Sequence, residues 1–386
     1  MTLSMISPQA LERALALRDL SDPAQGPHAL QLLVERITGA LAARWGCELR
    51  VHRAHPVVTT DDNYDRLHIG ADAVTRDARY TRYVAPGRVL RTHTTAMIPP
   101  LLRETAAEPP GDVLLACPGL AYRRDQIDRL HTGEPHQMDL WRIAARPLGR
   151  RELLEIVETL VDALAPGAAY RLNPSPHPYT EGGIEVEVEW EGSWVEVGEC
   201  GLALPAILRE CGLPEGWSGL AMGVGLDRLL MRAKGIPDIR LLRAEDPRIA
   251  AQMHDLAPYR AVSHQPPVRR DLSVALPEET TPEEVGDRVR TALGPRADSL
   301  EAVEVLSETP HDQLPPAARG RIGLRPGQKN VLVRVVIRDL SRTLTSEQAN
   351  ELRDDVYAAL HQGDAWQWAS AGRGGGAVTS SPAPTG

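Results

Sequence analysis

Residues 184–190, with the sequence IEVEVEW, alternate apolar and acidic side chains with a period of two. This alternation is typical of a strand with one buried face, and it constrains the fold more than any other segment. The segment SWVEVGECGLALP, which starts at residue 193, predicts a second strand of this kind. Residues 111–144 predict a buried strand that breaks at Pro118 and Gly119, then a loop and another strand. The middle of the chain is therefore expected to be rich in strands.

Helical spacing of apolar residues appears on both sides of these strands. Residues 8–45 repeat Leu and Ala at helical intervals, and residues 151–167 predict an amphipathic helix closed by Pro and Gly. Residues 88–104 predict a strand or turn that enters a helix stopped by the two prolines at 99–100, with a possible restart at Leu101. Residues 220–235 change from strand-like to helical, with glycines at the join.

A connector with several prolines, residues 257–270, marks the expected domain boundary. After it the patterns predict strand, helix, strand, strand and helix, with one short final strand unassigned, which suits a small ferredoxin-like α/β sandwich. The expected division is an N-terminal helical segment at 1–56, a central domain at 57–256, a C-terminal domain at 257–368 and a disordered tail at 369–386.

Composition narrows the functional classes. The chain has 386 residues and a net charge of −9, which argues against a protein that coats nucleic acid, although a local basic surface remains compatible with RNA. No run approaches the roughly 20 apolar residues that span a bilayer, and the N-terminus lacks a cleavable hydrophobic core, so we expect a cytoplasmic protein without a membrane partner. The spacing of the four cysteines predicts neither a zinc site nor a disulfide framework. Phe is absent altogether.

The first cluster of chemically active residue types is AYRRDQIDRLHTGEPHQMDLW, residues 121–141. An arginine at the end of a buried strand can hold a phosphate with two parallel hydrogen bonds, and the sheet fixes its position. Arg123 is the candidate for this role. The alternative is a solvated hairpin laced with salt bridges.

The second cluster is GVGLDRLLM, residues 223–231, where glycines let the backbone approach a ligand and Arg228 lies one turn inside the following helix. In this order the two clusters resemble motifs 2 and 3 of class II aminoacyl-tRNA synthetases. Four further segments narrow the resemblance to the phenylalanyl type of these synthetases, over roughly residues 85–250. They are RTHTTA, NPSPHPYTEGGIEVEVEW, SWVEVGECG and GIPDIRLL. The C-terminal part looks like that family's ferredoxin-fold anticodon-binding domain, in a single-chain, organellar-type layout.

The resemblance implies an α+β fold with an antiparallel-sheet core, and it implies roles for individual residues. Arg123 would hold the α-phosphate of ATP and Arg228 the γ-phosphate, as the two catalytic residues. Glu134 and His136 would line the ATP pocket. Glu196 matches a magnesium-binding acid of the family, although an exposed strand glutamate is the alternative.

The amino-acid site is also implied by matching positions. His93, Thr95, Gln137 and Asp139 correspond to residues that hold the ammonium and carboxylate ends of the amino acid in the family. Asp139 stands where Glu is usual. Ala221 keeps the small residue of the pocket floor.

The sequence departs from the family's pattern at residues that are expected to surround the aromatic ring of the substrate. The F-P-F pattern of the family is His177-Pro178-Tyr179 here, and Glu199 replaces a glycine. One interpretation is a pocket for a more polar aromatic amino acid. The other is general avoidance of Phe without a change of substrate, because Leu220 and Met222 also stand where the family favours Phe. Synthesis of the protein under Phe scarcity is one hypothesis for that avoidance.

The C-terminal part has one strongly basic run. Between residues 319 and 342 it contains seven basic residues against one acid, which predicts a surface for RNA phosphates, and the residues assigned to tRNA are Arg319, Arg321, Arg334, Arg338 and Arg342. The alternative is a solvated edge strand protected by charge.

The activity implied by the resemblance is ATP-dependent activation of an aromatic amino acid and its transfer to tRNA, with tRNA for Phe as the expected partner and Mg²⁺ as cofactor. Two alternatives remain open. One is a paralogue that delivers the activated amino acid to a non-tRNA acceptor, and the other is a non-catalytic regulator that binds an amino acid or RNA. Both a monomer and a homodimer are compatible with the sequence.

Overall fold

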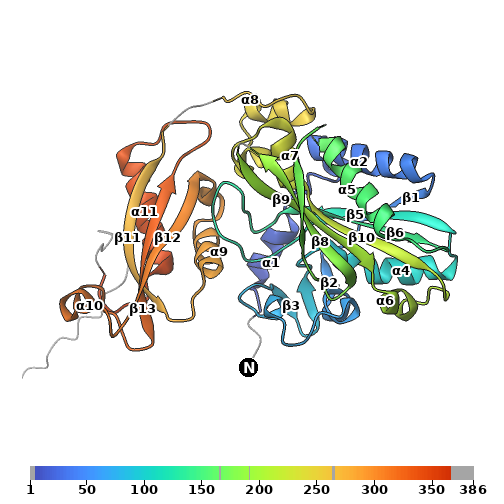
Figure 1. Ribbon diagram of the computed structural model, residues 1–386. Coiled ribbons are helices and arrows are strands. Elements are labelled where there is room, and N and C mark those ends of the chain that lie inside the picture. The colour runs from blue at the N-terminus through green and yellow to red at the C-terminus, as the bar shows by residue number, and fades with distance from the viewer. Residues whose placement is uncertain (1–4, 165–166, 191, 263–265, 367–386) are drawn as a thin grey trace, which may run out of the picture.

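The computed structural model describes residues 5–164, 167–190, 192–262 and 266–366. Its larger body is built on one twisted seven-stranded sheet in the order β1-β5-β6-β10-β9-β8-β7 (Figure 1). Neighbouring strands are antiparallel except for β1 and β5, which are parallel. The strands are β1 (Glu48–Val51), β5 (Asp112–Leu120), β6 (His136–Ala144), β7 (Tyr170–Pro174), β8 (Thr180–Trp190), β9 (Ser193–Ala203) and β10 (Ser218–Gly225).

The alternating segment forms β8, as its period predicts. Ile184, Val186 and Val188 are buried in the main hydrophobic core, and the glutamates between them lie on the other face. The expected break at Pro118 is wrong, because β5 continues to Leu120. The backbone of Pro118 faces the side of β5 on which β1 lies, but β1 already ends opposite Ala116, so the missing N–H of proline leaves no strand partner unpaired.

Three helices cover one face of the sheet and share its core, namely α2 (Ala29–Trp45), α5 (Arg150–Leu164) and α7 (Leu226–Lys234). The expected boundary after residue 56 is therefore wrong. Leu30, Leu33 and Ile37 of α2 are fully buried in the same core as the strands, and β1 is an edge strand of the sheet. The first helix, α1 (Pro8–Leu15), packs through Ala14 on a small separate cluster.

The opposite face is covered by α4 (Ile98–Ala107) and α6 (Pro205–Glu210). The prolines at 99–100 do not stop a helix but stand in the first turn of α4, where backbone N–H groups have no helical partner to lose. Beside α4 lies a small sheet in the order β2-β4-β3, with β2 (Val57–Thr59), β3 (Tyr83–Ala85), β4 (Arg88–Leu90), the short helix α3 (Thr60–Asn63) and the 3₁₀ turn η4 (Thr94–Met97).

The smaller body contains a three-stranded antiparallel sheet in the order β11-β13-β12, packed against α9 and α11 (Figure 1). The predicted order of strands and helices is confirmed, with one extra helix, α10. The final short strand is not found among the residues that the structure describes up to 366, so the ferredoxin-like assignment stays a prediction. The expected tail at 369–386 lies outside the described residues. The elements are β11 (Val268–Pro277), α9 (Pro282–Leu293), β12 (Leu300–Pro310), α10 (Pro316–Ile322), β13 (Gln328–Ile337) and α11 (Ser346–Leu360), preceded by η5 (Ile239–Arg243) and α8 (Pro247–Ala250).

The cores are aliphatic for the most part, as expected for a chain without Phe. Trp141, Tyr64 and Tyr357 are the large aromatic side chains that are completely buried among the described residues. Leu220 and Met222, both fully buried, occupy the positions at which the resembling family favours Phe. In the described part of the chain, no helix is both long and apolar enough to cross a membrane.

Candidate active site

A cavity of about 880 Å³ opens over the start of β6, the middle of β9 and the end of β10. Its wall includes Arg123 from the segment after β5, Gln137 from β6, Glu196 from β9 and Arg228 from α7. These residues are far apart in the sequence, and the antiparallel pairing of β6 with β10 and of β10 with β9 brings them together. The two arginines that the sequence singles out therefore face one space.

Arg228 is oriented by contacts that leave part of its guanidinium accessible. Its Nη2 donates to Nε2 of His131 at 3.0 Å, and its Nη1 lies 3.7 Å from Glu196. Nδ1 of His131 lies 2.7 Å from Asp128, a contact that holds the ring with Nε2 toward Arg228. Sequence reasoning missed His131, and its place inside the polar hairpin was the available signal.

Arg123 is held more loosely. Its backbone N–H donates to the carbonyl of Gly133 at 3.0 Å, and its Nε lies 3.5 Å from the carboxylate of Asp125. The side chain is 40% exposed, so an anion in the cavity has direct access to its remaining N–H groups. Two accessible guanidinium groups in one cavity suit a polyphosphate chain.

Asp139 lies buried directly behind Thr95, which lines the cavity, and it accepts hydrogen bonds from two hydroxyl groups. Thr94 and Thr95 donate to its Oδ2 at 2.8 and 3.0 Å, and the indole of Trp141 is 3.4 Å from its Oδ1. Burial raises the pKa of Asp139 to about 6, although these hydrogen bonds act in the opposite direction. A buried carboxylate without a cationic partner is suited to receive an ammonium group, which supports the expected role of Asp139 and Thr95.

His93 and Gln137 also line the cavity. Neither ring nitrogen of His93 has a hydrogen-bond partner of good geometry among the described residues. Burial, assisted by the charge of Arg123, lowers the pKa of His93 to about 4, so the ring is neutral at pH 7. His93 therefore contributes a neutral polar ring to the cavity wall, beside the backbone of Asn63.

Three aromatic rings form a stack that begins in the cavity. The rings of His177 and Tyr179 have centroids 5.4 Å apart, and Tyr179 in turn stacks on Trp141 at 6.4 Å. Nε2 of His177 lies 2.9 Å from Glu199, which also accepts a hydrogen bond of 2.7 Å from the Ser175 hydroxyl. The sequence indicated His177, Tyr179 and Glu199, but Ser175 and Trp141 were missed because only the fold brings them to this site.

Three expected site residues lie elsewhere or are differently engaged. Ala221 is not on the cavity wall, because its side chain is buried in the core opposite Trp141, its strand partner. His136 is buried, with Nδ1 donating to Asp227 at 2.7 Å and Nε2 accepting from the N–H of Leu20 at 3.0 Å. Its ring fixes the start of α7 against β6, and its ring nitrogens have little capacity left for ATP.

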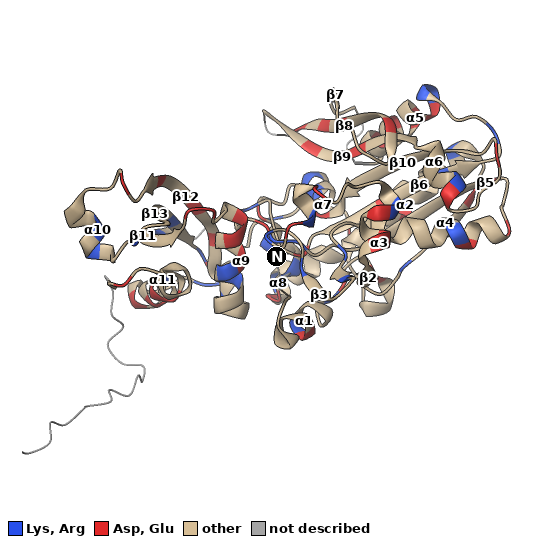
Figure 2. Cartoon of the chain, turned by 90° about the horizontal axis from the view of Figure 1, so that it is seen from below, with Lys and Arg blue, Asp and Glu red and all other residues tan. Residues whose placement is uncertain are grey.

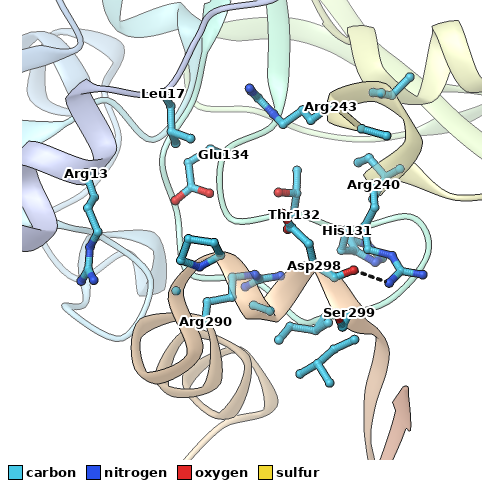
Figure 3. Close-up of a pocket in the computed structure, with 18 of the residues that line it drawn as sticks. Arg13, Leu17, His131, Thr132, Glu134, Arg240, Arg243, Arg290, Asp298 and Ser299 are labelled. Carbon is cyan, nitrogen blue, oxygen red and sulfur yellow. Dashed lines mark hydrogen bonds between the residues drawn. The ribbon is translucent and has the colours of Figure 1, made fainter. Parts of the chain in front are cut away.

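Glu134 lines a second cavity, of about 820 Å³, between the two bodies (Figure 3). It forms an ion pair with Arg82, and although burial raises the pKa of Glu134, the charge of Arg82 outweighs this and leaves it lowered. Arg290 of α9 and Arg13 of α1 also line this cavity (Figure 3). Glu134 thus lines the second cavity and not the one that contains Arg228.

The C-terminal body holds this loop from outside. Arg290 donates to the carbonyl oxygens of Asp125 and Gln126. The side chain of Ile127 belongs to the hydrophobic core of the C-terminal sheet. Nε of Arg129 lies 2.9 Å from Glu301. The segment that follows Arg123 is therefore part of the interface between the two bodies.

The basic run of the C-terminal body does not form one patch. Arg334 pairs with Asp271 at 2.8 Å, Arg342 with Asp339 at 3.3 Å, and Arg338 with Glu301 at 2.7 Å at the interface. Arg319 and Arg321 belong to α10, which lies at the end of the molecule remote from the large sheet (Figure 2). Neither forms an ion pair with any residue that the structure describes, so the guanidinium groups of these two are not neutralised by a carboxylate of the described chain.

Glu196 was assigned to magnesium. Among the described residues, no group of three or more His, Cys, Asp or Glu side chains is arranged to hold a metal ion. Burial raises the pKa of Glu196, against the charge of Arg228. A single carboxylate beside phosphate-binding arginines fits Mg²⁺ that takes most of its ligands from substrate phosphates and water, and does not fit a resident metal ion.

Comparisons with known proteins agree with this geometry. The family model described as the tRNA synthetases class II core domain (F) matches residues 19–253. A probable mitochondrial phenylalanine--tRNA ligase of Drosophila melanogaster is 28% identical over 400 residues, covering 87% of this chain and 83% of the relative. The chloroplastic/mitochondrial phenylalanine--tRNA ligase of Arabidopsis thaliana is 30% identical over 324 residues, covering 79% of this chain and 70% of the relative.

A third relative also carries the name of a phenylalanine--tRNA ligase. The phenylalanine--tRNA ligase alpha subunit of Prochlorococcus marinus (strain MIT 9313) is 35% identical over 240 residues, covering 61% of this chain and 69% of the relative. The matched region of the family model contains every residue of the cavity that holds Arg123 and Arg228 except Glu283. The chain belongs to the class II aminoacyl-tRNA synthetase family, in its phenylalanyl-type branch.

Proposed function

We propose that this chain joins ATP to the carboxylate of an aromatic amino acid and transfers the aminoacyl group to tRNA. The observation that carries the proposal is the cavity whose wall contains Arg123, Arg228 and Thr95, with the buried carboxylate of Asp139 hydrogen-bonded to Thr95. Two cationic groups for a polyphosphate and one anionic group for an ammonium match the charges of the two substrates. The similarity to phenylalanine--tRNA ligases supports the same reaction class.

In the first step, the amino acid is bound with its ammonium group at Asp139 and its carboxylate toward Arg123. A carboxylate oxygen attacks the α-phosphorus, the new P–O bond forms as the bond to the β-phosphate oxygen breaks, and pyrophosphate leaves. Arg123 neutralises charge at the α-phosphate and Arg228 at the far phosphate, so both act mainly by positioning and electrostatic stabilisation. His93, being neutral, contributes hydrogen bonds without adding charge.

In the second step, a terminal ribose hydroxyl of tRNA attacks the acyl carbon, and the adenosine monophosphate leaves. No side chain forms a covalent intermediate in this scheme. The separate C-terminal body and the arginines of α10 support tRNA as the acceptor. When bound, Mg²⁺ would supply charge neutralisation between phosphate oxygens, with Glu196 as the protein ligand that fits it.

The test is ATP–pyrophosphate exchange with purified full-length protein, followed by charging of total tRNA with the amino acid that supports exchange. Exchange together with charging is the expected result. Exchange without charging would overturn the tRNA step and favour a non-tRNA acceptor. Absence of exchange with every aromatic amino acid would contradict the proposal and favour a regulator that binds without catalysis.

A further inference from the structure

One end of the cavity wall contains the close polar pair His177 and Glu199, with Ser175 behind it. Ser175 donates to one carboxylate oxygen of Glu199 at 2.7 Å, and the other oxygen lies 2.9 Å from Nε2 of His177. His177 and Glu199 both line the cavity, and both remain partly accessible to it. An opposite-charge pair is thus part of the wall that a bound amino acid must cover.

Position in the sheet fixes this pair. Glu199 lies on β9 directly opposite Gly223 of β10, so no side chain from that neighbouring strand position covers it. His177 lies in the turn between β7 and β8 and stacks on Tyr179. The close contact with Glu199 raises the pKa of His177, and the same contact lowers the pKa of Glu199, so the structure favours the charged forms of both groups.

Covering such a pair with an unsubstituted phenyl ring is unfavourable. Loss of water from charged groups costs free energy that only new hydrogen bonds offset. A site built with hydrogen-bonding groups therefore discriminates strongly against an analogue that lacks the matching group, whereas an all-carbon pocket discriminates weakly. The remaining hydrogen-bonding capacity of His177 and Glu199 is matched by a ring that carries a hydroxyl group or a nitrogen.

General avoidance of Phe does not account for this wall. In the core, Leu220 and Met222 show that positions without Phe take aliphatic side chains, and both are completely buried. At the cavity, by contrast, His177 occurs together with an acidic partner on β9, Glu199, and Ser175 donates a hydrogen bond that orients this partner. Replacement of one planar ring by another would need neither Glu199 nor Ser175.

We propose that Ser175, His177 and Glu199 are specificity-determining residues that select an aromatic amino acid with a hydroxyl group or nitrogen on its ring over phenylalanine. The inference rests on the proposed function, because it names the substrate class of the same site. Asp139 and Arg123 hold the parts common to all amino acids, whereas the Ser175–Glu199–His177 chain faces the part that differs.

The experiment measures kcat/KM for ATP–pyrophosphate exchange with phenylalanine, tyrosine, 3-hydroxyphenylalanine, 4-aminophenylalanine and histidine. We expect at least one of the polar substrates to exceed phenylalanine by about 10-fold or more, the discrimination that unpaired polar groups impose at minimum. Phenylalanine as the best substrate would overturn the inference and leave the proposed adenylation intact. No exchange with any member of the panel would overturn both.

Variants separate selection from general damage. The double variant His177→Phe with Glu199→Gly removes the polar pair, and we expect it to shift the preference toward phenylalanine by about 10-fold or more through KM. Glu199→Gln keeps the shape and one acceptor oxygen, so it should lose part of the preference. Equal losses for all substrates would contradict the specificity role.

The matched control is another His–Glu pair of the same length. His68 and Glu210 also lie 2.9 Å apart, but on the surface and away from the cavity wall. Glu210→Gln should leave the ratio of kcat/KM values unchanged. Thermal melting of each variant shows whether it is folded, and the ratio between two substrates remains interpretable even for a partly destabilised variant because both are measured on the same preparation.

Discussion

The backbone N–H of Val303 donates a hydrogen bond of 2.9 Å to the carbonyl oxygen of Ile127. Through this bond the C-terminal sheet takes hold of the loop that begins at Arg123, and the side chain of Ile127 enters the C-terminal hydrophobic core. The position of Arg123, the arginine that we propose to bind the α-phosphate, is thereby connected to a body whose sequence lies more than a hundred residues away. The effects expected of substitutions near Arg123 follow from this contact of Ile127 and from the contacts of the residues that line the cavity.

Replacing Ile127 by Ala should both destabilise the interface and slow adenylation. The side chain is 7% exposed, and truncation of a buried Ile costs about 2 to 5 kcal/mol. Urea unfolding followed by tryptophan fluorescence checks the first effect, and ATP–pyrophosphate exchange checks the second. Leu306→Ala on β12, at a position that is 40% exposed, should change neither quantity. Normal exchange in a destabilised Ile127→Ala protein would show that the loop does not need the C-terminal body.

Arg123→Ala should lower the rate of ATP–pyrophosphate exchange by roughly 10²- to 10³-fold, the range found for loss of one preorganised charge-stabilising donor. The matched control is Arg44→Ala on α2. Arg44 has nearly the same side-chain exposure, 39% against 40%, and forms an ion pair with Glu158 outside the cavity. A comparable loss in both variants would contradict a role at the α-phosphate.

Replacing His131 by Asn should raise KM for ATP by about 10-fold while leaving KM for the amino acid nearly unchanged, since a charge-assisted hydrogen bond contributes about 1.5 kcal/mol. The reason is that Nε2 of His131 orients Arg228 at 3.0 Å. His68→Asn provides the control at similar exposure, 33% against 34%. A change in KM for the amino acid alone would contradict this assignment.

The dependence of amino-acid binding on pH should follow Asp139. The pKa of this group is raised to about 6 in the free protein, so the carboxylate is ionised at pH 7.5 and becomes protonated as the pH falls through 6. An ammonium group needs the ionised form, so KM for the amino acid should rise on acidification below about pH 6. Asp139→Asn should raise KM at pH 7.5 and abolish this pH dependence. Steady-state exchange kinetics between pH 5 and 8 measure both.

The raised pKa of Asp139 also predicts how the stability of the folded protein depends on pH. A carboxyl group whose pKa is raised on folding binds its proton more tightly in the folded state, so the unliganded protein gains stability as the pH falls from 7 toward 5. Asp139→Asn should remove this contribution to the pH dependence. Thermal melting without substrates, in buffers of equal ionic strength, tests it, and an unchanged slope in the variant would show that another group is responsible.

Binding of tRNA should depend on Arg319 and Arg321 more than on Arg334. The double replacement of Arg319 and Arg321 by Ala should weaken binding and reduce the salt dependence of log K by roughly one unit for each RNA phosphate that is no longer neutralised. Arg334→Ala should have less effect, because Asp271 already accepts two hydrogen bonds from its guanidinium. Filter binding at several salt concentrations gives the slopes.

The sequence by itself determined the elements that depend on local patterns. The alternation in β8 requires one buried face, the spacing of Leu and Ala requires the amphipathic helices, and the glycines before Arg228 mark the change from β10 to α7. The order of the motifs around Arg123 and Arg228 was sufficient to indicate the family and the charge of the site. These features are readable because each is carried by residues close together in the chain.

The tertiary structure decided whatever depends on contacts between distant segments. It placed β1 in the large sheet, buried Ala221 behind Trp141, turned Glu134 toward Arg82 and set Ile127 into the C-terminal core. It also joined Ser175 and Glu199, which are separated by 24 residues. No local pattern encodes such pairs, because they follow from the sheet register and from the packing of two bodies. The selectivity that we propose for the cavity depends on them.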